Sequence, residues 1–354
     1  MLNAFLKGLA ISPLVFLFAC DNSLNVNDEW QDTSVVYAIL DAKADTQWVR
    51  LQRGWLGQGD IDQSAQTGDS IYYSETFQVL LEELNASGAV NKSITLDYDN
   101  SSRQLNDGFF TSDGFHLYRT TESIVPDRNY RLRIIKNNGE AEVRGNAYVI
   151  NGNHTITRPT AVQKIAWEPF RDYTVEFNTQ ENAKVFQTFI TLNYKEINSQ
   201  NPSAKPDTLK ATVRLPLRTV NTLNSGQAVI VGYTTESLLQ GFRQAIPLDP
   251  NVKRFVIDID FEVLAGGEDL YTYMSVNEPA TGIVTERPDF SNIENGYGLM
   301  SSRALNGRYE KEFSEQGLLQ FILSDAMCDR NFGRVFNTPQ GNDTCYCDSF
   351  GNCN

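Results

Sequence analysis

The chain has 354 residues, of which 44 are acidic and 30 are basic, so its formal net charge is −14, and 41% of its residues are hydrophobic. This length exceeds one small domain, and two domains with real cores are expected. An acidic surface disfavours nucleic-acid binding, because phosphate backbones are bound by cationic stripes, and no nucleic-acid partner is expected.

The first twenty residues predict export. Lys7 precedes an apolar run, 10–19, that is too short to span a bilayer. The following Leu17-Phe18-Ala19-Cys20 resembles the processing site of bacterial lipoproteins. The resemblance implies a signal peptide over 1–19 and a lipid anchor on Cys20 that binds the protein to a membrane, with 20–32 as a tether. An ordinary secreted protein is the alternative.

Residues 33–152 predict an N-terminal β-sandwich. The stretch 35–40 is apolar on both faces, as in a buried strand, and 130–136 alternates between apolar and polar residues. Asn137-Asn138-Gly139 predicts a hairpin turn, since Asn-Gly tolerates a positive φ. About seven such strands with turn signals between them favour a sandwich.

Residues 160–312 predict a second β-rich domain with short helices at 234–245 and 268–275. In the strand 255–263, the apolar side chains are expected to face the core and the acidic ones the solvent. The inward set is Phe255, Ile257, Ile259, Phe261 and Val263, and the outward set is Asp258, Asp260 and Glu262. The expected fold class is therefore mainly β, with two sandwich-like domains of immunoglobulin or transthyretin type.

The last part, 313–354, predicts a helix over 315–327 capped by Ser314, followed by a cysteine-rich tail. Four cysteines in a polar tail of an exported chain are typical of two disulfides, and their pairing stays open. These are Cys328, Cys345, Cys347 and Cys353. The alternative, a four-thiolate metal site, lacks the paired Cys-x2-Cys spacing of zinc ribbons, so no metal is expected.

Catalytic motifs are absent from the sequence, and a non-enzymatic protein without a cofactor other than its lipid is expected. The two histidines, His116 and His154, lie in no metal-binding or triad pattern. Asp258, Asp260 and Glu262 would stand about 7 Å apart along one strand, so a solvated strand face is favoured over a calcium site.

The long loop 54–74 offers candidate ligand-binding aromatics. Trp55, Tyr72 and Tyr73 lie among glycines and acids. Exposed aromatic rings on a loop carried by a rigid sandwich are a common way to hold a glycan or a peptide. The alternative is that these rings fold back and fill the sandwich.

Several stretches together resemble the uncharacterised outer-membrane lipoproteins of Bacteroidota, a family defined only as a domain of unknown function. They are Val35-Val36-Tyr37-Ala38-Ile39-Leu40 with Val49-Arg50-Leu51, Asn182-Ala183-Lys184-Val185-Phe186, Leu270-Tyr271-Thr272-Tyr273 and 295–303. The resemblance implies a lipid-anchored accessory subunit coupled to an outer-membrane partner, such as a TonB-dependent transporter or a secretion machine. A fimbrial or adhesin subunit and a free-standing glycan-binding lipoprotein are the alternatives. Cell-surface and periplasmic orientations both stay open.

Overall fold

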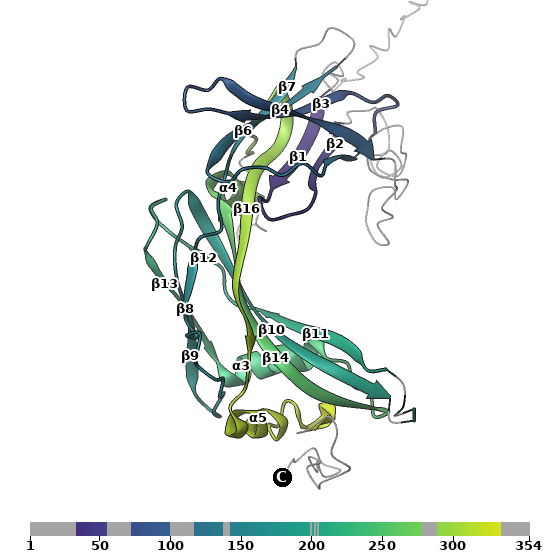
Figure 1. The fold of residues 1–354 in the computed structure, drawn as a ribbon, viewed down its shortest axis with the longest axis vertical. Helices are drawn as coiled ribbons and strands as arrows, with labels where there is room; N and C mark the ends of the chain where they lie inside the picture. The colour runs from purple at the N-terminus through teal and green to yellow at the C-terminus, as the bar shows by residue number, and fades with distance from the viewer. Residues whose placement is uncertain are drawn as a thin grey trace, which may run out of the picture.

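The computed structural model describes residues 33–54, 72–99, 117–136, 142–198, 200–201, 203, 205–277 and 289–333. The chain is mainly β, with two sandwich-like domains arranged end to end along the long axis of the molecule (Figure 1), so the predicted fold class is confirmed. Within these ranges no helix is long and apolar enough to cross a membrane.

The N-terminal domain consists of two sheets that share strand β4. Its strands from the first part of the chain are β1 Ser34–Leu40, β2 Gln47–Arg53, β3 Gln78–Leu84, β4 Val90–Asp99, β5 Leu117–Thr120, β6 Arg128–Ile135 and β7 Val143–Val149. The first half of β4 pairs with β3 and its last residues pair with β5, so β4 passes from one sheet to the other. The side chains between the sheets form one apolar core.

Two late strands complete this domain. β15, Ile293–Glu294, pairs with β7, and the first half of β16, Gly296–Lys311, pairs in parallel with β1. Ile293 and Met300 belong to the N-terminal core. The assignment of all of 160–312 to the second domain is therefore wrong for 293–302, because β16 is long enough to run through both domains (Figure 1).

The second domain packs a three-stranded sheet against the far half of the large sheet. The small sheet has the order β13-β9-β8, and the large one continues as β16-β14-β10-β11. Its strands are β8 Thr155–Arg158, β9 Asp172–Asn178, β10 Ala183–Asn198, β11 Asp207–Arg214, β12 Arg218–Thr219, β13 Ala228–Thr234 and β14 Val252–Gly267.

Two of the predicted helices lie in this half of the chain. Helix α3, Thr235–Ala245, begins at the Thr234 cap, whose side chain accepts a hydrogen bond from the Ser237 N–H, and it buries Leu238 and Phe242. Helix α4, Glu268–Asn277, follows β14 and contacts β16 near the junction between the domains. Both predictions are confirmed.

The described part of the C-terminal region belongs to the second domain. Helix α5, Glu315–Ile322, begins at the Ser314 cap as predicted but ends five residues early. A 3-10 turn, η1 Cys328–Arg330, and the short strand β17 Phe332–Gly333 follow. Phe321, Met327 and Phe332 lie in the core of the second domain.

A β-bulge in β14 changes which side chains face inward. Opposite β10, Ile257 has no partner in the register, so the alternation reverses at this point. The predicted inward face is confirmed from Ile259 to Val263. It is wrong for Phe255, which is half-buried, and for Ile257, which is 39% exposed, whereas Arg254 is fully buried.

Candidate functional site

The aromatic residues predicted to bind a ligand are not exposed where the structure describes them. Tyr72 and Tyr73 are 7% and 8% exposed. The Tyr73 hydroxyl is hydrogen-bonded to Ser34 Oγ at 2.8 Å, and its ring packs edge-on against Phe77 at 4.9 Å. Of the two expectations, folding back onto the sandwich is therefore the one observed for Tyr73, which packs in the N-terminal core. Tyr72 is likewise buried. Trp55 lies outside the described residues.

Several other predicted residues also lie outside those ranges: the lipidation site Cys20, His116, Cys345, Cys347 and Cys353. The lipid anchor and the pairing of the four cysteines therefore stay predictions. Cys328 is described, and its side chain is buried at 5% exposure.

His154 is buried and hydrogen-bonded to the backbone of a neighbouring strand. Its side chain is fully buried, and its Nε2 lies 2.7 Å from the carbonyl oxygen of Val263 on β14. Burial lowers the pKa of this imidazole below its ordinary value, so the ring is neutral at physiological pH.

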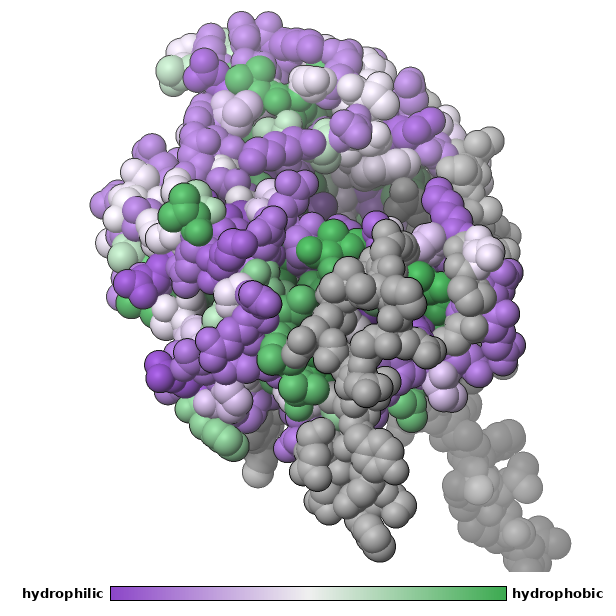
Figure 2. All heavy atoms as spheres, turned by 60° about the horizontal axis from the view of Figure 1, so that its bottom comes forward, coloured by the Kyte–Doolittle hydropathy of each residue, from purple (hydrophilic) through white to green (hydrophobic). Residues whose placement is uncertain are grey.

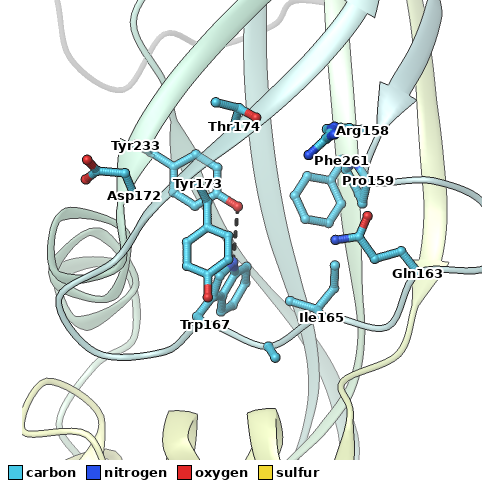
Figure 3. A pocket seen from close by; sticks show the side chains of 11 residues that line it. Arg158, Pro159, Gln163, Ile165, Trp167, Asp172, Tyr173, Thr174, Tyr233 and Phe261 are labelled. Atoms are coloured by element: carbon cyan, nitrogen blue, oxygen red, sulfur yellow. Dashed lines mark hydrogen bonds between the residues drawn. The ribbon is translucent and has the colours of Figure 1, made fainter.

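A small pocket of about 180 Å³ lies in the second domain, and Figure 3 shows the side chains that line it. The residues that line it come from the small sheet, from β14 and from the loop 159–171. They are Arg158, Pro159, Gln163, Ile165, Ala166, Trp167, Asp172, Tyr173, Thr174, Tyr233 and Phe261. Its volume is below the 300–1,000 Å³ typical of drug-sized sites, so it fits a single ring or one side chain.

The floor of the pocket is aromatic and fixed in place. Trp167 and Phe261 are 2% and 1% exposed, and Trp167 Nε1 donates a hydrogen bond to the Tyr233 hydroxyl at 3.1 Å (Figure 3). The rings of Tyr173 and Tyr233 stack at 6.1 Å with an interplanar angle of 26°. Burial raises the pKa of Tyr233, so its hydroxyl stays protonated and the floor carries no charge.

Polar groups surround the mouth of the pocket. Arg158, Gln163 and Asp172 are exposed, and Thr174 is half-buried. The Tyr173 hydroxyl accepts a hydrogen bond from the Glu168 N–H at 2.9 Å, which fixes the ring at the edge of the cavity. An apolar floor with a few polar groups at the rim is the usual composition of a binding site.

The loop 159–171 carries two strongly exposed apolar side chains. Val162 is 92% exposed and Phe170 is 90% exposed, the highest values among the large hydrophobic residues that the structure describes. The Phe170 backbone has φ 59, which is rare for a bulky residue, and its N–H donates to Glu236 Oε1 at 2.6 Å. The N–H of Ser314 donates to the Ile165 carbonyl at 2.8 Å, which ties the loop to the start of α5.

The sequence analysis did not identify this site. The available sign was Trp167-Glu168-Pro169-Phe170, in which two aromatic residues flank a charged residue and a proline outside any strand pattern.

The acidic residues of β14 lie in a different environment from the one predicted. Asp260 is only 8% exposed, so a solvated strand face is wrong for this residue. Among the described residues, no group of three or more His, Cys, Asp and Glu side chains could hold a metal ion.

No family model and no curated protein matches the chain. Among solved structures, the C-terminal globular domain of an oligosaccharyltransferase from Pyrococcus abyssi is 9% identical with a TM-score of 0.22, over 80% of this chain and 50% of that one. Escherichia coli alpha-2-macroglobulin activated by porcine elastase is 8% identical with a TM-score of 0.19, over 79% of this chain and 20% of that one. The chain thus spans half the length of the first protein and a fifth of the second, and likenesses at these scores assign no function.

Proposed function

We propose that this protein is a non-enzymatic lipoprotein of the outer membrane, anchored through Cys20, that acts as a binding subunit of an envelope complex. A TonB-dependent transporter or a secretion machine is the class of partner that we favour. The observation that supports a binding role is the exposure of Val162 and Phe170 on the loop 159–171, the same loop that supplies Trp167 to an aromatic pocket.

The position of this loop fits a tethered protein. The predicted tether 20–32 leads into β1, in the N-terminal domain. The loop 159–171 lies next to α5, which is at the opposite end of the molecule (Figure 1). An anchor at one end and a binding surface at the other would let the protein reach a partner at a distance from its own lipid.

The chemistry of the loop favours a protein partner. Aromatic side chains in or beside pockets dominate the binding energy of protein interfaces, and the contacts that surround them exclude water. Full burial of Phe170 and Val162 against a partner would contribute roughly 3–5 kcal/mol together. That is enough to change an affinity by about two to three and a half orders of magnitude.

A gentle affinity purification from detergent-solubilised outer membranes, followed by mass spectrometry, tests this proposal. The full-length protein should recover one partner in stoichiometric amount, and the double variant Val162→Ser, Phe170→Ser should lose it. Val125→Ser is the matched control, because Val125 is an exposed apolar residue of the N-terminal domain. Recovery of the same partner by the double variant would contradict the proposed surface, and recovery of no partner by the wild type would contradict the complex.

A glycan is the second candidate ligand, favoured by one observation. The stacked rings of Tyr173 and Tyr233 form a flat aromatic wall in a cavity that fits one ring. A glycan array distinguishes the two candidates, since a glycan-binding protein would give signals that Tyr173→Ala removes. A blank array with the wild-type protein would exclude this second candidate.

A further inference from the structure

The pocket of the second domain contains a buried hydroxyl whose hydrogen is not used. The Tyr233 hydroxyl accepts the Trp167 Nε1–H at 3.1 Å, and it makes no other hydrogen bond with the described residues. Burial raises the pKa of this hydroxyl, so it keeps its hydrogen. In Figure 3 the hydroxyl points from the Tyr233 ring toward the space beside Phe261, where it can donate to a ligand.

A second donor lies across this space, on the loop 159–171. Gln163 Oε1 accepts the Thr160 N–H at 3.3 Å, so the other end of the amide is the NH2 group. This group forms no hydrogen bond within the part of the chain that the structure describes, and Figure 3 shows it directed toward the rings. The pocket therefore offers hydrogen-bond donors both from β13 and from the loop.

The carboxylates near the pocket do not offer matching acceptors. The Asp172 carboxylate points away from the rings (Figure 3). Glu176 accepts a hydrogen bond from the Thr174 hydroxyl at 3.0 Å and pairs with Arg158 at 3.4 Å. A ligand that carries N–H or O–H groups would thus find no free carboxylate in the cavity among the described residues that line it. Because an unpaired buried donor is costly, a ligand with acceptors and few donors is favoured.

The apolar walls of the pocket fit a single compact ring. Tyr173 and Tyr233 stack with their centroids 6.1 Å apart and form one wall. Ile165 and Phe261, which are 4% and 1% exposed, form the facing wall (Figure 3). The cavity of about 180 Å³ admits one ring and little else. The preferred ligand is thus a ring that is joined to hydrogen-bond acceptors.

We propose that the pocket binds a proline residue of the protein partner, presented in an extended polyproline II segment. The proline ring lies between the two walls, and peptide carbonyl oxygens accept hydrogen bonds from Tyr233 and Gln163. This inference rests on the protein-binding role proposed above. Proline combines a compact apolar ring with a peptide nitrogen that has no hydrogen, whereas every other residue brings a backbone N–H. Aromatic-lined sites bind such segments because the polyproline II helix is preformed and loses little entropy.

Titration of N-acetylated hexaproline amide into the isotope-labelled, full-length protein tests the ligand class by NMR. The Trp167 indole N–H is the reporter, because its hydrogen bond to Tyr233 lies under the pocket. We expect its signal to shift with a Kd of about 0.1–1 mM. A matched peptide of six N-methylalanines also lacks N–H groups but has no ring, so it should bind at least about fourfold more weakly.

Three results of this titration would overturn the proposal. The first is the absence of a shift with hexaproline up to about 10 mM, and the second is equal affinity for the two peptides. The third is a shift with methyl glycosides but not with hexaproline, which would assign the pocket to glycans instead.

Gln163→Glu separates recognition from folding. Glutamate keeps an acceptor for the Thr160 N–H, but it replaces the donor with a carboxylate oxygen that repels a peptide carbonyl. Hexaproline should therefore bind at least about fivefold more weakly to this variant. Gln78→Glu, at an exposed position of β3, is the matched control and should bind hexaproline as the wild type does. Equal affinities of Gln163→Glu, Gln78→Glu and the wild type would overturn the donor role of Gln163.

The affinity purification described above distinguishes this inference from the proposed function. If the protein recovers a partner but does not bind hexaproline, only the ligand class is overturned. If it binds hexaproline but recovers no partner, the complex is contradicted and the ligand class is supported.

Discussion

Trp167 Nε1 donates its hydrogen bond to the Tyr233 hydroxyl at 3.1 Å, and this contact joins the loop 159–171 to strand β13 beneath the pocket. Both side chains are buried, so neither polar atom has an alternative partner in solvent. Tyr233→Phe should therefore destabilise the protein by about 1–3 kcal/mol, because it leaves the indole N–H unpaired. Urea unfolding followed by circular dichroism measures this change.

The matched control is Tyr297→Phe, which removes a hydroxyl from a residue that is 52% exposed. Its effect on the unfolding free energy should stay within about 0.5 kcal/mol. Equal losses in the two variants would show that the Trp167–Tyr233 contact does not stabilise the pocket.

The sequence predicted the elements that depend on local patterns. Ser314 was identified as a helix cap because a hydroxyl before an apolar run is a local signal. The inward face of Ile259–Val263 followed from a period of two. These features require no knowledge of distant parts of the chain.

The sequence could not predict features that depend on long-range pairing. The bulge at Ile257 arises from the register of β14 against β10, and a single reversal of the alternation has no separate sign in the sequence. Likewise, the parallel pairing of Ser34 with Gly296 joins residues far apart in the chain, so the division of β16 between two domains was missed. The pocket was missed for the same reason, because two of its lining residues, Trp167 and Phe261, are far apart in the sequence.

Gly298 should be the least replaceable glycine in the described part of β16. Its φ is +120, and an added Cβ would lie 1.9 Å from the Val36 carbonyl oxygen on β1. Gly298→Ala should therefore separate β1 from β16 and destabilise the protein by more than about 3 kcal/mol. Chemical denaturation of the wild type and of Gly298→Ala measures this change in the free energy of unfolding.

Gly226→Ala is the control for this substitution. Gly226 also has a positive φ, +80, but nothing lies within 4 Å of its added Cβ. Only backbone strain should remain, which costs about 1 kcal/mol. A Gly298→Ala variant as stable as Gly226→Ala would show that the close approach of β1 is not maintained in solution.

Arg254 should be essential for the attachment of the C-terminal segment. Its guanidinium is fully buried, pairs with Glu196 at 2.8 Å and donates to the Arg330 carbonyl at 2.9 Å. Arg254→Met should cost roughly 3 kcal/mol, because it leaves the Glu196 carboxylate without its partner. Lys164→Gln breaks an exposed pair and should cost less than about 1 kcal/mol. If thermal unfolding shows equal losses of stability in Arg254→Met and Lys164→Gln, a special role for Arg254 is contradicted.

The ion pairs on the N-terminal domain predict a loss of stability in acid. Hydrogen bonds from Arg133 and Arg144 lower the pKa of Glu142 from its ordinary 4.5 to about 2. The contribution of ionised Glu142 to the free energy of unfolding is thus complete above pH 4.5, and it is lost as the pH falls from 4.5 towards 2. Solvent screening limits it to the order of 1 kcal/mol.

Arg133→Gln should flatten this part of the pH profile of the unfolding free energy, since Arg133 also bonds Glu82. Lys92→Gln, which breaks an exposed pair with Glu122, should leave the profile unchanged. If both variants keep the slope of the wild type between pH 4.5 and 2, the network does not cause the acid sensitivity.

The most direct test of the proposed function is site-specific photo-crosslinking in intact cells. A photoreactive amino acid replaces Phe170 in the full-length protein, and a control protein carries it at Val125 in the N-terminal domain. We predict that position 170 crosslinks to one envelope protein in high yield and that position 125 does not. The absence of any crosslink from position 170, or the same products from both positions, would contradict a binding surface on the loop 159–171.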